Sequence, residues 1–224
     1  MTPRAIVTDI EGTTSSIRFV VDVLFPYSRA RLAPFVRAHA DELGAVFDAV
    51  HREVGDTALD IEAIIARLEQ WHDADRKIAP LKTVQGLIWA DGYACGAFAG
   101  HVYPDAVAGL RRWHARGIAL YVYSSGSVAA QKLLFGHSEA GDLTPLFAGH
   151  FDTAIGAKRD AHAYRAIVAA LGLPADRILF LSDVAEELAA AREAGLGVTL
   201  IARDGLPEAS PFPVATGFDP ILPD

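Results

Sequence analysis

The sequence predicts an α/β fold with a mostly parallel sheet. Short, β-branched apolar runs alternate with amphipathic helical stretches, and glycine or proline follows most of those stretches. The alternation is interrupted once, after the first strand, by residues 20–100, which show helical periodicity and few strand signals. Strands that alternate with helices form βαβ units, so we expect a parallel sheet with one all-helical insertion.

The composition indicates a folded chain with a substantial core. The 224 residues are 51% hydrophobic and 21% charged, and at roughly 150 residues per domain the length predicts one or two domains. The net charge of −8 argues against a general nucleic-acid binder, which would present a basic face. The single cysteine, Cys95, excludes an intrachain disulfide framework, and we expect it to be a small buried side chain.

The lengths of the apolar runs indicate where the protein is located, and its charge indicates how it assembles. The run near the N-terminus is too short for a signal peptide, and no stretch reaches the roughly 18 apolar residues of a membrane span. We therefore expect a cytoplasmic protein with no membrane partner. The acidic balance and the lack of an obvious partner helix favour a monomer.

The first strand is expected at residues 5–7, running into Thr8 and Asp9. In the helical insertion, one apolar face is clear, because its residues recur at intervals of three and four. Its members are Ile61, Ile64, Ile65, Leu68 and Trp71. A later helix is expected at residues 82–98.

The second half of the chain returns to alternation. The expected strands are 118–123, 151–155, 178–181 and 198–201, and the expected helices are 105–114, 127–135, 160–171 and 185–194. The last 20 residues hold five prolines, so we expect an irregular arm there. The resulting domains are a Rossmann-like core, residues 1–16 and 101–224, and a helical cap, residues 17–100.

Polar side chains gather where the expected strands end. In a parallel sheet, ligands bind beyond the carboxyl ends of the strands. The residues expected there are Asp9, Glu11, Gly12, Thr13, Ser124, Ser125, Lys158, Ser182 and Asp183. Acids so close together need a cation, and oxygen ligands suit Mg²⁺. The lysine and the hydroxyls suit a phosphate, and a carboxylate beside a metal-bound phosphate can attack phosphorus.

These residues resemble the four ordered motifs of the haloacid dehalogenase superfamily. The matching segments are DIEGT at 9–13, YVYSSGS at 121–127, Lys158, and LFLSDVAEE at 179–187. Longer segments are similar to the enolase-phosphatases of methionine salvage, a branch of that superfamily. They are DIEGTTSSI from residue 9, LFPY at 24–27, YSSGSVAAQKLLFGHS at 123–138 and GHFDTAIGAK at 149–158.

The resemblance implies a role for each acid. Asp9 matches the nucleophile that forms an aspartyl-phosphate, and its other oxygen would bind Mg²⁺. Glu11 stands where most phosphatases of the superfamily have Asp. There it would be the general acid and contribute to the metal site, and Glu is the usual residue in the enolase-phosphatases. Asp183 matches the acidic metal ligand, and Glu187 matches the second acid of that motif, outside the direct ligands.

The resemblance also implies the binding residues and the reaction. Ser124, Ser125 and Lys158 match the groups that bind the phosphate. The enzyme would enolise 2,3-diketo-5-methylthiopentyl-1-phosphate with one Mg²⁺ per subunit. It would then release phosphate and the acireductone 1,2-dihydroxy-3-keto-5-methylthiopentene. The cap would close over the site and exclude water.

Other interpretations remain open at this point. The scaffold also suits another Mg²⁺-dependent small-molecule phosphatase or a phosphomutase, and a silent binding module is a further alternative. Asp183 could simply cap a helix, with Glu186 completing a capping box. The serine loop could be a plain turn with Ser127 as the helix cap, and Lys158 and Glu187 could be solvated surface residues.

Overall fold

The computed structural model describes residues 2–222, so Met1 and the last two residues of the predicted core lie outside it. The chain divides into two compact units. One contains the residues up to Phe19 and those from Ala99 onward; the other is Val20–Phe98.

The first unit is built on a six-stranded sheet in which every strand pair is parallel. In chain order the strands are β1 (Ala5–Thr8), β2 (Ala119–Tyr123), β3 (Phe147–Phe151), β4 (Ile178–Ser182), β5 (Gly197–Ile201) and β6 (Val214–Ala215). Their spatial order is β3-β2-β1-β4-β5-β6. The predicted parallel α/β fold is therefore confirmed.

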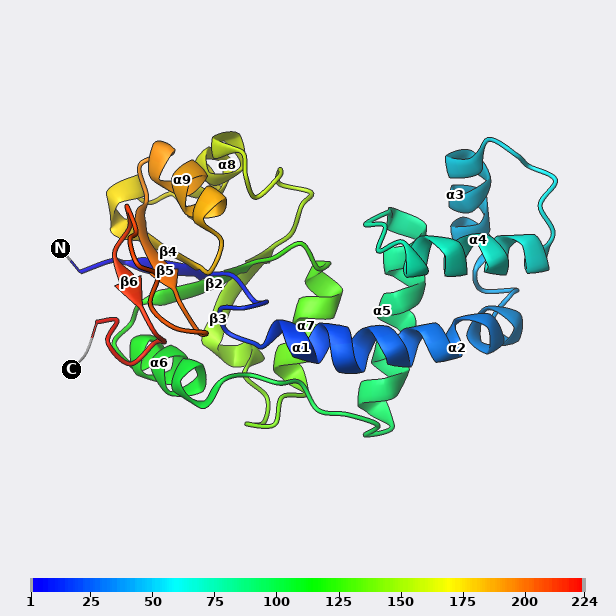
Figure 1. The fold of residues 1–224 in the computed structure, drawn as a ribbon, viewed down its shortest axis with the longest axis horizontal. Coiled ribbons are helices and arrows are strands. Elements are labelled where there is room, and N and C mark those ends of the chain that lie inside the picture. The colour runs from blue at the N-terminus through cyan, green and yellow to red at the C-terminus, as the bar shows by residue number, and fades with distance from the viewer. Residues whose placement is uncertain (1, 223–224) are drawn as a thin grey trace. The chain divides into compact units, whose positions relative to one another are not determined.

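Helices cover both faces of this sheet (Figure 1). They are α6 (Pro104–Ala115) and α7 (Val128–Gly136) on one face, and α8 (Ala161–Leu171) and α9 (Ala185–Glu193) on the other. Short helical turns complete the unit: α1 (Ile17–Phe19), η2 (Thr144–Leu146) and η3 (Ala175–Arg177). Helix α7 begins where expected, because the Ser127 hydroxyl accepts a hydrogen bond from the Ala130 amide.

The strand order places the candidate site. Strand β1 is fully buried and lies between β2 and β4. After β1, the chain adds β2 and then β3 on one side of it. The later strands β4, β5 and β6 are added on the other side, so the direction in which the sheet grows reverses at β1. This reversal is the topological switch point at which open α/β sheets bind ligands. The segments that follow β1, β2 and β4 consequently meet at one edge.

Several expected elements were wrong in position. The strand expected at 151–155 lies earlier, at Phe147–Phe151, because Asp152 starts a turn: its carboxylate accepts the Ala154 amide and its carbonyl accepts the Ile155 amide. The C-terminal arm is not wholly irregular, since β6 pairs with β5. The helix expected at 82–98 is α5 (Ala79–Ala94), and Cys95, expected to be buried, is exposed at its end.

The second unit is helical. Its elements are a π-helical turn η1 (Val20–Leu24), α2 (Phe25–Ala38), α3 (Gly44–Val54), α4 (Ile61–Asp73) and α5. On α4 the predicted apolar face is buried at Ile64, Ile65, Leu68 and Trp71. The Asp60 carboxylate caps this helix by accepting the Ala63 amide. In the part of the chain that the structure describes, no helix has the length and apolar character needed to cross a bilayer.

Candidate active site

Asp9 is the first residue after β1 and is almost completely buried, at 2% exposure. Its amide donates to the Leu181 carbonyl on β4 (2.9 Å), so the chain remains tied to the sheet at this point. The loop then turns sharply, because the amides of Thr13, Thr14 and Ser15 all donate to the Ile10 carbonyl. The Thr14 hydroxyl closes the turn by donating to the Asp9 carbonyl (2.7 Å).

Gly12 is required by this loop for two reasons. Its φ of +74° lies in the left-handed region that favours glycine. A Cβ built at this position would also collide with the carboxylate of Asp183, which follows β4. The absent side chain therefore allows the loops after β1 and β4 to approach each other closely.

Lys158 joins two buried acids. Its Nζ lies 2.6 Å from Asp9 Oδ1 and 2.8 Å from Glu187 Oε2, and all three side chains are at most 10% exposed. Glu187 also accepts the Ser182 hydroxyl (2.9 Å). Helix α8 helps to fix the lysine, because the Tyr164 hydroxyl donates to the Lys158 carbonyl (2.7 Å). The interpretations of Lys158 and Glu187 as solvated surface residues were therefore wrong.

Negative charge exceeds positive charge around Asp9. Burial raises the pKa of Asp9 to about 8; the Lys158 ammonium opposes the shift, while Glu11 and Glu187 add to it. Burial would lower the pKa of Lys158, but the Asp9 and Glu187 carboxylates outweigh it and raise that pKa. Burial also raises the pKa of Asp183. One ammonium thus does not fully compensate this group of acids.

Glu11 and the serine loop meet across the edge of the sheet. The buried Ser124 hydroxyl donates to Glu11 Oε2 (3.2 Å) and accepts the Gly126 amide (3.1 Å). Ser125, the other residue expected to bind phosphate, is exposed in the same loop. The structure therefore brings Glu11 and Ser124 into contact and leaves Ser125 at the surface.

Asp183 does not cap a helix. Helix α9 begins after Val184 and has no side-chain cap. Instead, the Thr13 hydroxyl donates to Asp183 Oδ1 (3.3 Å) and accepts the Asp183 amide (3.0 Å). The capping-box alternative was therefore wrong, because a contact between residues far apart in the sequence determines the position of this carboxylate.

The oxygen-rich edge fits a hard divalent cation. Within residues 2–222, no three acid, histidine or cysteine side chains are already gathered into a complete metal-binding group. Mg²⁺ does not require one, since it commonly binds one or two carboxylates together with water and a substrate phosphate. Asp9 Oδ1 is buried and, apart from the Lys158 ammonium, has no hydrogen-bond partner among the described residues. Because that ammonium is shared with Glu187, the acids around Asp9 have room for a further cation.

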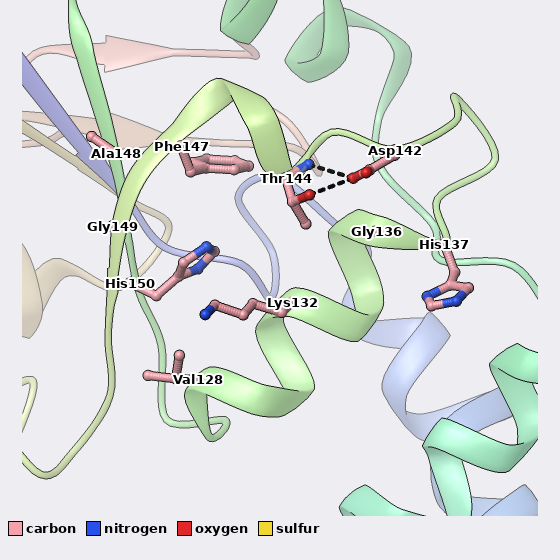
Figure 2. Close-up of a pocket in the computed structure, with 10 residues that line it drawn as sticks. All are labelled: Val128, Lys132, Gly136, His137, Asp142, Thr144, Phe147, Ala148, Gly149 and His150. Atoms are coloured by element: carbon pink, nitrogen blue, oxygen red, sulfur yellow. Dashed lines mark hydrogen bonds between the residues drawn. The ribbon is translucent and has the colours of Figure 1, made fainter.

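A separate cavity of about 780 Å³ lies between α7 and β3 (Figure 2). Lys132, His137 and His150 line it, and the Asp142 carboxylate at its rim already accepts two hydrogen bonds from Thr144. None of the predicted site residues lines this cavity. Asp142 is the one acid among the lining residues, and the predicted chemistry needs several, so we place the candidate active site at Asp9.

The sequence reasoning missed one residue near the site. The Arg203 guanidinium, from the segment after β5, donates to the Thr13 carbonyl through Nε (3.0 Å) and Nη2 (2.7 Å). A signal for it exists in the sequence, because Arg203 follows the strand expected at 198–201 and so lies at the same edge of the sheet as Asp9 and Asp183.

Replacement of Gly12 tests the close approach of the two loops. Gly12→Ala is expected to lower the free energy of unfolding by more than Gly117→Ala, measured by urea denaturation. Gly117 is the matched control, since its φ is +73° and nothing lies within 4 Å of its added Cβ. The backbone conformation costs each variant about 1–2 kcal/mol, and only Gly12→Ala must also displace Asp183. Equal losses in the two variants would contradict the tight packing at Gly12.

Comparison with known proteins gives the family. The model of the haloacid dehalogenase-like hydrolases matches residues 3–195. A solved structure, the UTR4 protein of Saccharomyces cerevisiae, superimposes with a TM-score of 0.84 at 30% identity, over 97% of this chain and 99% of the yeast chain.

Two curated relatives carry the name enolase-phosphatase E1. The protein from Methylococcus capsulatus is 56% identical over 99% of this chain and 98% of its own. The protein from Pseudomonas aeruginosa is 58% identical over 92% of each chain. The chain therefore belongs to the haloacid dehalogenase-like hydrolases and, within them, to the enolase-phosphatase E1 family.

Proposed function

We propose that this enzyme enolises 2,3-diketo-5-methylthiopentyl-1-phosphate and then removes its phosphate, as a step of methionine salvage. The product is the acireductone 1,2-dihydroxy-3-keto-5-methylthiopentene. The observation that supports phosphate chemistry best is the contact between the buried Asp9 carboxylate and the Lys158 ammonium, beside the Ser124 hydroxyl loop. The names of the close relatives support the choice of substrate.

In the first half-reaction a proton leaves carbon 1 of the substrate and the carbon 2 carbonyl becomes an enol. Glu11 is our candidate for moving a proton in this step, because its carboxylate is held at the site edge by Ser124. The helical unit, Val20–Phe98, is proposed to act as a cap that excludes water during the reaction.

In the second half-reaction the Asp9 carboxylate attacks phosphorus, and the bond from phosphorus to the carbon 1 oxygen breaks. Glu11 gives a proton to the departing enediol oxygen. Water then hydrolyses the aspartyl-phosphate, which releases inorganic phosphate and regenerates Asp9. Lys158 and Ser124, together with Ser125 at the loop surface, bind the phosphate oxygens throughout.

One Mg²⁺ per subunit is proposed, held by Asp9, Glu11 and Asp183. When bound, it supplies positive charge that offsets the repulsion between the carboxylates and the phosphate. This proposal accounts for the excess of acids over ammonium groups at the site.

The role of Asp9 is tested by Asp9→Asn. We expect phosphate release to fall at least about a thousandfold, since an amide cannot serve as the nucleophile. Asp60→Asn is a matched control: it makes the same chemical change at an exposed helix cap, where asparagine is an equally good residue. Phosphate release by Asp9→Asn at near wild-type rate, with circular dichroism showing a folded protein, would rule out Asp9 as nucleophile.

The length of the Glu11 side chain is tested by Glu11→Asp. Removing one methylene withdraws the carboxylate from Ser124, and we expect enolisation to fall by about 100-fold and by a larger factor than hydrolysis. Stopped-flow absorbance follows the enol, and a phosphate assay follows hydrolysis. Glu193→Asp is the control, because that residue only pairs with Arg165 at the surface. Equal losses in the two half-reactions would remove the support for a special role in enolisation.

A further inference from the structure

Arg203 is held rigidly between the loop after β1 and the start of α6. Its side chain is 11% exposed, and its Nη1 lies 2.8 Å from both carboxylate oxygens of Asp105. Its Nε and Nη2 both point to the Thr13 carbonyl. A guanidinium is planar, so contacts on both sides of the fork fix its orientation and, through it, the carbonyl.

The surroundings are shaped to hold this ion pair. The Phe218 amide donates to Asp105 Oδ2 (2.7 Å). The guanidinium carbon lies 4.1 Å from the centroid of the Tyr103 ring and 5.4 Å from that of Phe218. A Cβ at Gly217 would collide with the Asp105 carboxylate, so glycine leaves the space that this carboxylate occupies.

Thr13 connects the arginine to Asp183. The guanidinium holds the Thr13 carbonyl, and the Thr13 hydroxyl exchanges hydrogen bonds with the backbone and the carboxylate of Asp183. Thr13 is fully buried, whereas Asp183, whose carboxylate it holds, is exposed at the edge of the sheet. A change at Arg203 therefore reaches Asp183 through one intervening residue.

We propose that Arg203, oriented by Asp105, is a positioning residue that fixes the carboxylate of Asp183 for metal binding. The inference rests on the proposed function, in which Asp183 is a ligand of Mg²⁺. Arg203 acts through Thr13 and touches neither metal nor substrate. Partners that orient a metal ligand typically change metal affinity by about 10–100-fold when they are removed.

The test is direct metal binding by protein freed of metal with EDTA. Free Mn²⁺, a paramagnetic substitute for Mg²⁺, is measured by electron paramagnetic resonance during titration of wild type, Arg203→Met and Arg203→Lys. We expect the dissociation constant to rise at least about tenfold in Arg203→Met. The dissociation constant should rise less in Arg203→Lys, which keeps the positive charge opposite Asp105 but loses the planar group that contacts Asp105 and Thr13 through different nitrogens. The lysine variant also preserves the test if Arg203→Met does not fold.

Arg112→Met is the matched control. The Arg112 guanidinium donates to the carbonyls of Phe218 and Ile221, so it contacts the same C-terminal segment without contacting Thr13. We expect its Mn²⁺ affinity to stay within about twofold of wild type, even where its melting temperature falls. Equal metal affinities in folded Arg203→Met and Arg112→Met would overturn the inference.

A double-mutant cycle tests the route through Thr13. Thr13→Val removes the hydroxyl that holds Asp183, so adding Arg203→Met to it should weaken Mn²⁺ binding by less than about twofold. If Arg203→Met weakens Mn²⁺ binding by the same factor in the wild-type and in the Thr13→Val background, Arg203 does not act through this hydroxyl.

Two outcomes distinguish the inference from the proposed function. Wild-type protein that binds no Mn²⁺ would overturn the metal site itself and the inference with it, whereas normal binding by Arg203→Met would overturn only the positioning role.

Discussion

The ion pair between Asp9 and Lys158 is the interaction on which the site depends. Its atoms lie 2.6 Å apart, in surroundings from which water is almost excluded. A buried charge is stable only when paired, and removal of one partner from such a pair typically costs about 3–5 kcal/mol. Lys158 is also shared with Glu187, so the pairing leaves negative charge in excess. This excess of carboxylates favours the binding of a cation, and a bound cation would in turn offset the repulsion between the carboxylates and an anionic substrate.

The loop after β1 contains, within a few residues, both the groups that shape the site and the acids proposed to carry its chemistry. Its amides converge on the Ile10 carbonyl, which makes the turn tight enough to bring Glu11 to Ser124. Gly12 allows the Asp183 carboxylate to approach, and Thr13 holds it. Hydrogen bonds to the sheet on one side and to Arg203 on the other fix the position of this loop.

Sequence reasoning succeeded where one rule of topology applied. Parallel strands bring their carboxyl ends to a common edge, and Asp9, Ser124 and Asp183 do follow β1, β2 and β4, as the strand positions predict. It failed where distant contacts decide the outcome. The pattern around Asp183 suggested a helix cap, yet Thr13, 170 residues away, holds the side chain. The short β6 likewise depends on pairing with β5, which no local pattern encodes, whereas the end of β3 is fixed by a local turn at Asp152 that the apolar pattern did not reveal.

The most direct test of the central claim is to mix the enzyme with the diketo phosphate and record ultraviolet absorbance and phosphate release together. The experiment is run with Mg²⁺ and again with EDTA. We expect a transient enol signal followed by phosphate, with phosphate release lost in EDTA because the acids at the edge are then left without a cation. Phosphate release that is unchanged in EDTA, or that precedes any enol signal, would contradict the account.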